Sequence, residues 1–379
     1  MNTGRTRYAQ GATRCLPSRL HRTVLLSLLA LTTGVVMALV AGAARAQTGS
    51  VINARGIVYT ANEHGNSISA IDLAVGQVAT VPITISPHNI QVTPDGALVL
   101  AVGEPVSDGH AQGHDGAAHG AAEAKGRLLV LDATALAKGP FAEVEVGAHP
   151  AHVVTDLGGH RAFVTNAGDD TVSVVDLARM TVVGTVATGS YPHGLRVSPD
   201  GREAYVANVQ DGSLSVIDTG SLTEVARIPV GTTPVQVGFT PDGSRVYASL
   251  RDENRIAIVD TASRALIGTV DVGRNPIQVH ATPDGRFVYA ANQGTDSEPA
   301  DTVTVIDTAT GSVVDTIRTG KGAHGVSVSD DGALVFVTNI VDATVSVIDN
   351  ATRKVVARFP VGRGPNGISY RAIGEGEKS

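Results

Sequence analysis

The sequence has one cysteine, no tryptophan and few aromatic residues, which make up 3% of its 379 residues. The cysteine, Cys15, precedes an apolar stretch near the start of the chain. The remainder therefore has no thiol for a disulfide, a cysteine-based zinc site or a CxxCH haem attachment. A fold this large can be stable on its hydrophobic core alone. The shortage of aromatics also argues against a surface that stacks nucleic-acid bases.

Residues 1–46 have the pattern of a secretory signal peptide. A basic start is followed by an apolar stretch at 24–40 and by Ala44-Arg45-Ala46, a small-x-small cleavage site before Gln47. An uncleaved membrane anchor is the alternative, because the apolar stretch is long for a signal. We expect a cleaved, periplasmic, monomeric protein with no membrane segment in its mature form.

Cleavage would make the protein markedly acidic. Residues 1–46 hold six arginines and no acidic residue, so their removal takes the formal charge from −7 to −13. Because the nucleic-acid backbone attracts positive charge, we expect no nucleic-acid partner.

A repeat of about 42 residues organises the rest of the chain. The copies open at equivalent positions: Pro87, Pro150, Pro192, Pro234, Pro276, Ala323 and Pro365. Within the third copy, short β-branched runs at 193–197, 203–208, 213–218 and 224–230 are separated by turn residues such as the Ser-Pro-Asp-Gly at 198–201. Four antiparallel strands per unit of this length are typical of a β-propeller blade.

The number of blades follows from the copies. Six copies are complete, residues 56–82 supply only strands two to four, and residues 365–370 supply only a first strand. The two incomplete pieces together form one split blade, which closes the ring and leaves no open sheet edge. The sequence thus predicts an all-β fold, a seven-bladed β-propeller over residues 51–371 with a loop inserted at 104–127.

The second strands carry the motif of a known family. The runs YTAN (59–62), FVTN (163–166), YVAN (205–208), YAAN (289–292) and FVTN (336–339) are each followed by a strand similar to TVSVID. This pattern resembles the YVTN-repeat β-propeller family, which includes periplasmic YncE-like proteins. The resemblance implies the architecture and leaves the function open, because such propellers serve many roles. Quinone-cofactor propellers carry tryptophan docking motifs that this chain lacks, so we expect no PQQ.

Histidines gather at the openings of neighbouring copies. Going round the ring, the histidine arc consists of His324, His88, His152 and His193, with Asn366 between the first two, while Val235 and Ile277 lie opposite. First strands line the central channel of a propeller, so the arc predicts a metal or a polar ligand at the channel mouth. The alternative is that each His simply occupies a surface turn.

The insertion at 104–127 adds further imidazoles on a Gly/Ala-rich tether. His110, His114 and His119 form a compositional metal-binding signal, and His64 lies in the equivalent loop of the split blade. Imidazole ligands in the periplasm favour copper, zinc or nickel. The alternative is a loop whose histidines are incidental.

Basic residues on the same face form a possible anion-binding half of the site. Arg274, Lys321 and Arg363 precede three consecutive openings, and Arg251 follows a second strand. They could bind a carboxylate or phosphate, or could be solvated loop charges.

From these patterns we expect a binding protein whose histidine-rich face holds a metal ion, a metal-bound ligand or a partner protein. Two alternatives stay open: a lactonase-like hydrolase or metal-dependent enzyme, and a purely structural interaction module. No catalytic residue can be assigned, and no carboxylate on the histidine arc stands out to favour an enzyme.

Overall fold

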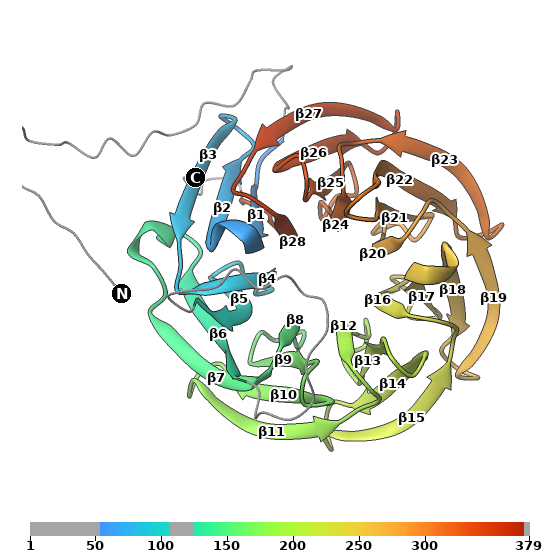
Figure 1. Ribbon diagram of the computed structural model, residues 1–379, viewed down its shortest axis with the longest axis horizontal. Coiled ribbons are helices and arrows are strands. Elements are labelled where there is room, and N and C mark those ends of the chain that lie inside the picture. The colour runs from blue at the N-terminus through green and yellow to red at the C-terminus, as the bar shows by residue number, and fades with distance from the viewer. Residues whose placement is uncertain (1–53, 107–123, 375–379) are drawn as a thin grey trace, which may run out of the picture. The chain divides into compact units, whose positions relative to one another are not determined.

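Seven antiparallel sheets of four strands are arranged around a central axis (Figure 1). This is a computed structural model, and it describes residues 54–106 and 124–374. Each first strand packs against the next one round the ring, from β4 through β8, β12, β16, β20, β24 and β28 back to β4. The predicted all-β seven-bladed propeller is confirmed.

The strands are grouped here by their place in the blade, from the axis outward. The innermost strands are β4 (Ile85–Val92), β8 (Pro150–Thr155), β12 (Pro192–Val197), β16 (Pro234–Phe239), β20 (Pro276–Ala281), β24 (Ala323–Val328) and β28 (Pro365–Arg371). The second strands are β5 (Leu98–Pro105), β9 (Arg161–Asn166), β13 (Glu203–Asn208), β17 (Arg245–Leu250), β21 (Phe287–Gly294), β25 (Leu334–Asn339) and β1 (Ile57–Asn62).

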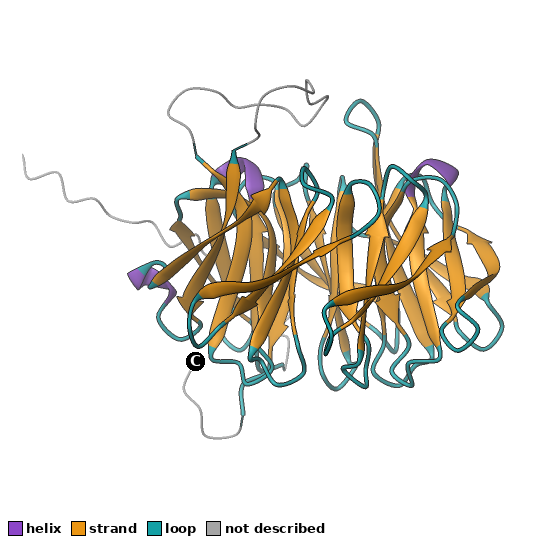
Figure 2. Ribbon diagram, turned by 90° about the horizontal axis from the view of Figure 1, so that it is seen from below, coloured by secondary structure: helices purple, strands orange, loops and turns teal. Residues whose placement is uncertain are grey.

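The third strands are β6 (Lys125–Asp132), β10 (Thr171–Asp176), β14 (Ser213–Asp218), β18 (Arg255–Asp260), β22 (Pro299–Asp307), β26 (Thr344–Asp349) and β2 (Ser67–Asp72). The outermost strands are β7 (Ala142–Ala148), β11 (Thr181–Ala187), β15 (Thr223–Pro229), β19 (Ala265–Asp271), β23 (Ser312–Arg318), β27 (Lys354–Pro360) and β3 (Gln77–Pro82). The described residues also form three short 3-10 helices: η1 (Glu63–Gly65), η2 (Leu136–Lys138) and η3 (Arg251–Glu253). Loops gather at the two ends of the blades (Figure 2).

One blade combines both ends of the described chain, as the sequence predicts. Its strand order is β28-β1-β2-β3, and β28 pairs antiparallel with β1, with Ile57 opposite Arg371 and Thr60 opposite Ile368. The pairing hydrogen-bonds the last strand to the first, so that no sheet edge is left open between first and last blade.

The aromatic residue of each YVTN-like motif fills the space between blades. These residues are at most 1% exposed: Tyr59, Phe163, Tyr205, Tyr247, Tyr289 and Phe336. Around Tyr205, for example, the cluster joins apolar residues of one blade with Val237 and Leu250 of the next. Burial of a side chain of this size contributes roughly 1.5–3 kcal/mol, so the motif stabilises the ring.

The repeated polar residues hold the turns and the loops together. Asp218 Oδ1 accepts hydrogen bonds from the backbone N–H groups of Gly220 and Ser221, which is an Asx turn. The asparagine that ends the motif joins the second strand to the third, and in one blade Oδ1 of Asn166 also accepts from the backbone N–H of Gly147 at 3.0 Å. Asn208 Nδ2 donates to the hydroxyls of Ser213 and Ser215 on the third strand.

Gly103 stands where most blades have this asparagine, for a steric reason. A Cβ at this position would lie 1.9 Å from the backbone oxygen of Ser86. Here β4 and β5 stay paired as far as Ile85 and Pro105, so the two backbones are too close for a side chain.

Some expectations fall on residues that the structure does not describe. The predicted signal peptide at 1–46 lies outside the described residues, and so do His110, His114 and His119 of the insertion. In the part of the chain that is described, no helix has the length and apolar character to cross a membrane.

Candidate metal centre

An irregularity in every innermost strand brings its opening residues to the axis. The pairing with the second strand shifts register directly after the opening position, for example between Pro192 and Leu195 in β12 and between Pro150 and Val153 in β8. Bulges of this kind re-aim side chains and interrupt pairing. The residues within the bulge are therefore free to project towards the channel, and three histidines of the arc do so.

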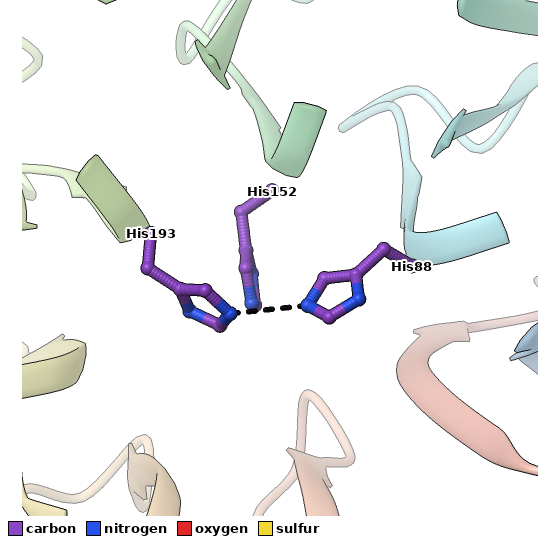
Figure 3. A group of neighbouring side chains, drawn as sticks. All are labelled: His88, His152 and His193. Carbon is purple, nitrogen blue, oxygen red and sulfur yellow. Dashed lines mark hydrogen bonds between the residues drawn. The ribbon is translucent and has the colours of Figure 1, made fainter. Parts of the chain in front are cut away.

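His88, His152 and His193 converge from the consecutive strands β4, β8 and β12 (Figure 3). Each ring offers one nitrogen, and these three atoms all lie within 4.8 Å of one another. The Nε2 atoms of His88 and His193 are 3.1 Å apart. Two ligands of a tetrahedral zinc ion with bonds of about 2.0–2.1 Å are separated by about 3.3 Å. The cluster is therefore already close to the spacing that a metal ion requires.

A buried carboxylate fixes the orientation of the His88 ring. Nδ1 of His88 lies 3.2 Å from Oε1 of Glu63, a residue of η1 that is 6% exposed. Because an ionised carboxylate only accepts hydrogen bonds, this contact favours the proton of the neutral ring on Nδ1. Nδ2 of Asn366, which can only donate, lies 3.1 Å from the same atom and competes with the carboxylate for it. Asn366 Nδ2 donates to the other oxygen, Oε2, at 2.6 Å and so holds the carboxylate in place. Nε2 of His88 is left as an acceptor directed at the cluster.

His193 is fixed in the same tautomer by the backbone. Its Nδ1 lies 3.1 Å from the carbonyl oxygen of Val235 on β16, and a carbonyl can only accept. Nε2 of His193 is therefore also an acceptor in the neutral ring. Two acceptor nitrogens facing each other at 3.1 Å repel unless a proton or a metal ion lies between them.

His152 completes the group from a fully buried position. Gly194 on the intervening strand lets Gln236 reach it, because a Cβ at Gly194 would lie 2.2 Å from Oε1 of Gln236. Oε1 of Gln236 accepts from the N–H of Val237, so its Nε2 faces Nδ1 of His152 at 3.2 Å as the donor. Nε2 of His152 is buried and has no hydrogen-bond partner among the described residues.

The surroundings keep two of these rings neutral. Burial, followed by the positive charges that His193 and His88 would carry, holds the pKa of His152 well below its usual range. Burial and the charge of His88 do the same for the pKa of His193. A metal binds the neutral imidazole, so His152 and His193 are in the binding state at neutral pH.

The fourth histidine of the arc stands apart from the convergent group. His324 is buried, and its Nδ1 donates to the carbonyl of Asn366 at 3.3 Å. Burial, and then the charge of His88, lowers its pKa to about 4. The charge of His88 thus affects the pKa of His324, but the ring nitrogens of His324 do not belong to the group of three.

The cations chosen from the sequence are exposed at the loops. Arg274 forms an ion pair with Glu298 at 2.5 Å, and Arg363 donates to the backbone oxygen of His64 at 2.7 Å. Lys321 and the side chain of His64 are exposed as well. Of the described residues singled out in the sequence, those that converge are the three histidines.

The sequence reasoning missed Glu63. It identified no carboxylate beside the histidine arc, whereas the structure places Glu63 against His88. The signal was available, because Glu63 follows the YTAN motif directly and lies in a loop on the same face as the openings. The sequence analysis selected the neighbouring His64. In the 3-10 turn, however, Glu63 is buried and His64 is exposed.

His280 is a half-buried residue of the innermost strand β20. Its Nδ1 is 3.3 Å from the carbonyl oxygen of Val326 on β24. Burial is the main cause that lowers its pKa to about 4, with a further contribution from the charge of Arg196.

Comparison with known proteins identifies the family. The sequence matches the YNCE-like beta-propeller family over residues 148–244 and 221–376, which is more than half of the chain. The chain belongs to this family, as its YVTN-like motifs predict. No curated protein matches it.

Solved structures share the fold at low sequence identity. A chain of hydrazine synthase from Kuenenia stuttgartiensis superposes with a TM-score of 0.62 at 23% identity, covering 75% of this chain and 89% of that one. A functionally unknown protein from Desulfotomaculum acetoxidans gives a TM-score of 0.66 at 16% identity, covering 84% and 99%. A protein from Bacteroides uniformis, provisionally assigned as a 6-phosphogluconolactonase, gives 0.64 at 16% identity, covering 83% and 99%. At these identities the likeness concerns the fold alone.

Proposed function

We propose that this chain is a periplasmic binding protein that holds one divalent transition-metal ion through His88, His152 and His193. Copper, zinc and nickel are the metals that suit imidazole ligands in this compartment. The observation that carries the proposal is the convergence of three ring nitrogens within 4.8 Å of one another, in which Nε2 of His88 and Nε2 of His193 face each other at 3.1 Å and repel when both are acceptors. A metal ion removes this repulsion and uses both lone pairs.

The groups around the cluster support the proposal. Ligating histidines usually donate their other ring N–H to a carboxylate or a backbone carbonyl, which fixes the ring. His88 has Glu63 in this place and His193 has the carbonyl of Val235. His152 differs, because Gln236 presents its amide N–H to Nδ1. Binding through Nε2 of His152 therefore requires the amide of Gln236 to turn over, which breaks the hydrogen bond that its Oε1 accepts from the N–H of Val237.

The test is isothermal titration with zinc and with copper, together with elemental analysis of the untagged protein. In a background that lacks residues 107–123, the His88→Ala/His193→Ala variant should lose at least about 100-fold in affinity. His160→Ala is the matched control, since His160 is exposed on the far turn of the β8–β9 connection and should change nothing.

The deletion background separates the two histidine-rich regions. One stoichiometric ion that survives the deletion and is lost in the double variant supports the channel site. Binding that disappears with residues 107–123 alone would overturn the channel site in favour of the inserted segment.

A second candidate function has one observation in its favour. Glu63 and His88 are two titratable groups within hydrogen-bond reach, at 3.2 Å, which is the arrangement that general acid–base catalysis uses. If a proton rather than a metal bridges His88 and His193, a lactone or ester hydrolase becomes the better assignment. Hydrolysis of a lactone panel by the metal-free protein, abolished in Glu63→Gln, would decide for it.

A further inference from the structure

Arg196 on β12 is a cation in the inner part of the ring whose hydrogen-bond donors are largely unused. Its Nη1 donates to the carbonyl oxygen of the preceding residue, Leu195, at 3.1 Å. A guanidinium has five N–H donors. Within residues 54–106 and 124–374 no carboxylate forms an ion pair with it, although removal from water lowers its pKa to about 10. Partly buried arginines without a counter-ion are costly, which points to a ligand that supplies one.

The position of Arg196 in the repeat directs it along the wall of the channel. It lies four residues after the opening proline, as do His280 in β20 and Ser369 in β28. At this position His280 reaches the carbonyl of Val326 on the next innermost strand, and the hydroxyl of Ser369 accepts from the N–H of Val92 on the next. Side chains here therefore lie across the seam between neighbouring innermost strands.

Between Arg196 and His280 the ring has a gap in side chains. The strand between theirs is β16, and its residue at this position is Gly238. Arg196 and His280 stand at the same position of the two innermost strands that flank β16, and the charge of Arg196 contributes to the lowered pKa of His280. No side chain at the equivalent position separates the guanidinium from the imidazole.

His280 determines what kind of ligand suits the gap. Its Nδ1 faces a carbonyl and must donate, so Nε2 of the neutral ring is an acceptor. The guanidinium binds two oxygens of a planar or tetrahedral oxyanion side by side. A ligand that uses both groups needs a negative charge for Arg196 and a hydroxyl proton for His280.

We infer that Arg196, Gly238 and His280 form an anion site in the channel that takes a small oxyanion carrying a hydroxyl, such as hydrogen phosphate. Its residues differ from those of the three-histidine cluster, although the charge of Arg196 also contributes to the lowered pKa of His152. The anion site also differs from the exposed loop cations Arg274 and Arg363, which already have partners.

The experiment is isothermal titration of the full chain, freed of metal with EDTA, against sodium phosphate and sodium sulfate at pH 7 and constant ionic strength. Sulfate has the shape and the double negative charge of hydrogen phosphate, but it has no proton to donate. We expect one phosphate to bind at least about tenfold more tightly than sulfate. Because the chain has no tryptophan, folding of each variant is checked by circular dichroism.

Four variants assign the roles. Arg196→Gln should lose phosphate binding by about 100-fold, and Arg196→Lys should retain part of it. His280→Phe should keep weak binding of both anions but lose the preference for phosphate. Arg202→Gln removes one positive charge from an exposed turn, where the side chain is 84% exposed, and should change neither affinity.

Each contrary result overturns a defined part of the inference. If the wild-type protein binds no phosphate at millimolar concentration, or if Arg196→Gln binds it unchanged, the site does not exist. Equal affinity for sulfate and phosphate in the wild-type protein would remove the role given to His280. Loss of phosphate binding in Arg202→Gln would show a net-charge effect only.

Discussion

Two positions of the repeat behave in opposite ways. The aromatic position of the second strand holds Tyr or Phe in six blades, and each of these rings is buried between blades. The residue after the opening proline varies round the ring: His88, His193 and Asn366 are polar, whereas Val235 and Ile277 are apolar. The aromatic position lies on the second strand of a blade, and the variable position lies on the innermost strand beside it. The position that repeats builds the ring, and the position that varies distinguishes one side of the channel from the other.

The largest effect is expected from breaking the repeated position. Tyr247 is fully buried, and its hydroxyl has no hydrogen-bond partner among the described residues. Tyr247→Ala should lower the free energy of unfolding by about 3–5 kcal/mol, because it leaves a cavity between blades. Chemical denaturation followed by circular dichroism measures this.

The control for that prediction uses the same residue. Tyr247→Phe keeps the ring and removes only the unpaired hydroxyl, so it should change stability by less than about 1 kcal/mol. Metal affinity should be unaltered in both variants. An Ala variant as stable as the Phe variant would contradict the assignment of this position to the fold.

A smaller effect is expected from a residue that only positions a ligand. Glu63→Gln removes the charge that orients His88 and should weaken metal binding about 10–100-fold without a comparable loss of stability. Glu298→Gln is the matched control, because Glu298 pairs with the exposed Arg274. Unchanged zinc affinity in Glu63→Gln, measured by competition with a chelator, would show that the carboxylate does not support the site.

The last effect concerns pH. The pKa of His280 is about 4 in the folded protein, against about 6.5 in an unfolded chain. Between these values the unfolded chain binds more protons, so the contribution of His280 to stability is present above pH 6.5 and is lost as the pH falls towards 4. In His280→Gln the free energy of unfolding should fall less steeply as the pH decreases over this range. The slope should correspond to the uptake of up to about one proton fewer on unfolding.

This difference is read from denaturation midpoints in chloride-based buffers that contain no oxyanion. Exposed His160 serves for comparison, since His160→Gln should leave the slope unchanged. A slope that is the same in His280→Gln as in the wild-type protein would mean that His280 is not buried in its neutral form.

The same contrast explains what could be predicted from the sequence. Strand bounds follow from local patterns, and the predicted runs at 203–208 and 213–218 coincide with β13 and β14. The split blade also follows, because its missing strand must come from the other terminus. His88, His152 and His193 could be placed on one side of the ring because each repeat forms one blade. The order of the repeats in the sequence therefore gives the order of the blades around the axis.

The remaining features depend on contacts between residues distant in sequence. Nothing in the local pattern shows that Gln236 crosses Gly194 to reach His152, or that Glu63 rather than His64 is buried. Arg196 looks like an ordinary strand residue until its lack of a carboxylate partner is known. Such relations are set by the bulges and by packing across neighbouring blades, which a single repeat does not encode.

The closing strand β28 links metal binding to the completion of folding. Asn366 lies on β28, the last strand of the described chain, and it holds Glu63 from the opposite end of the sequence while its carbonyl accepts from His324. The inner residues of the cluster could assemble earlier, but the groups that orient them are complete only when the final strand has joined the first. The proposed site would therefore retain a metal ion only after the last strand has closed the ring.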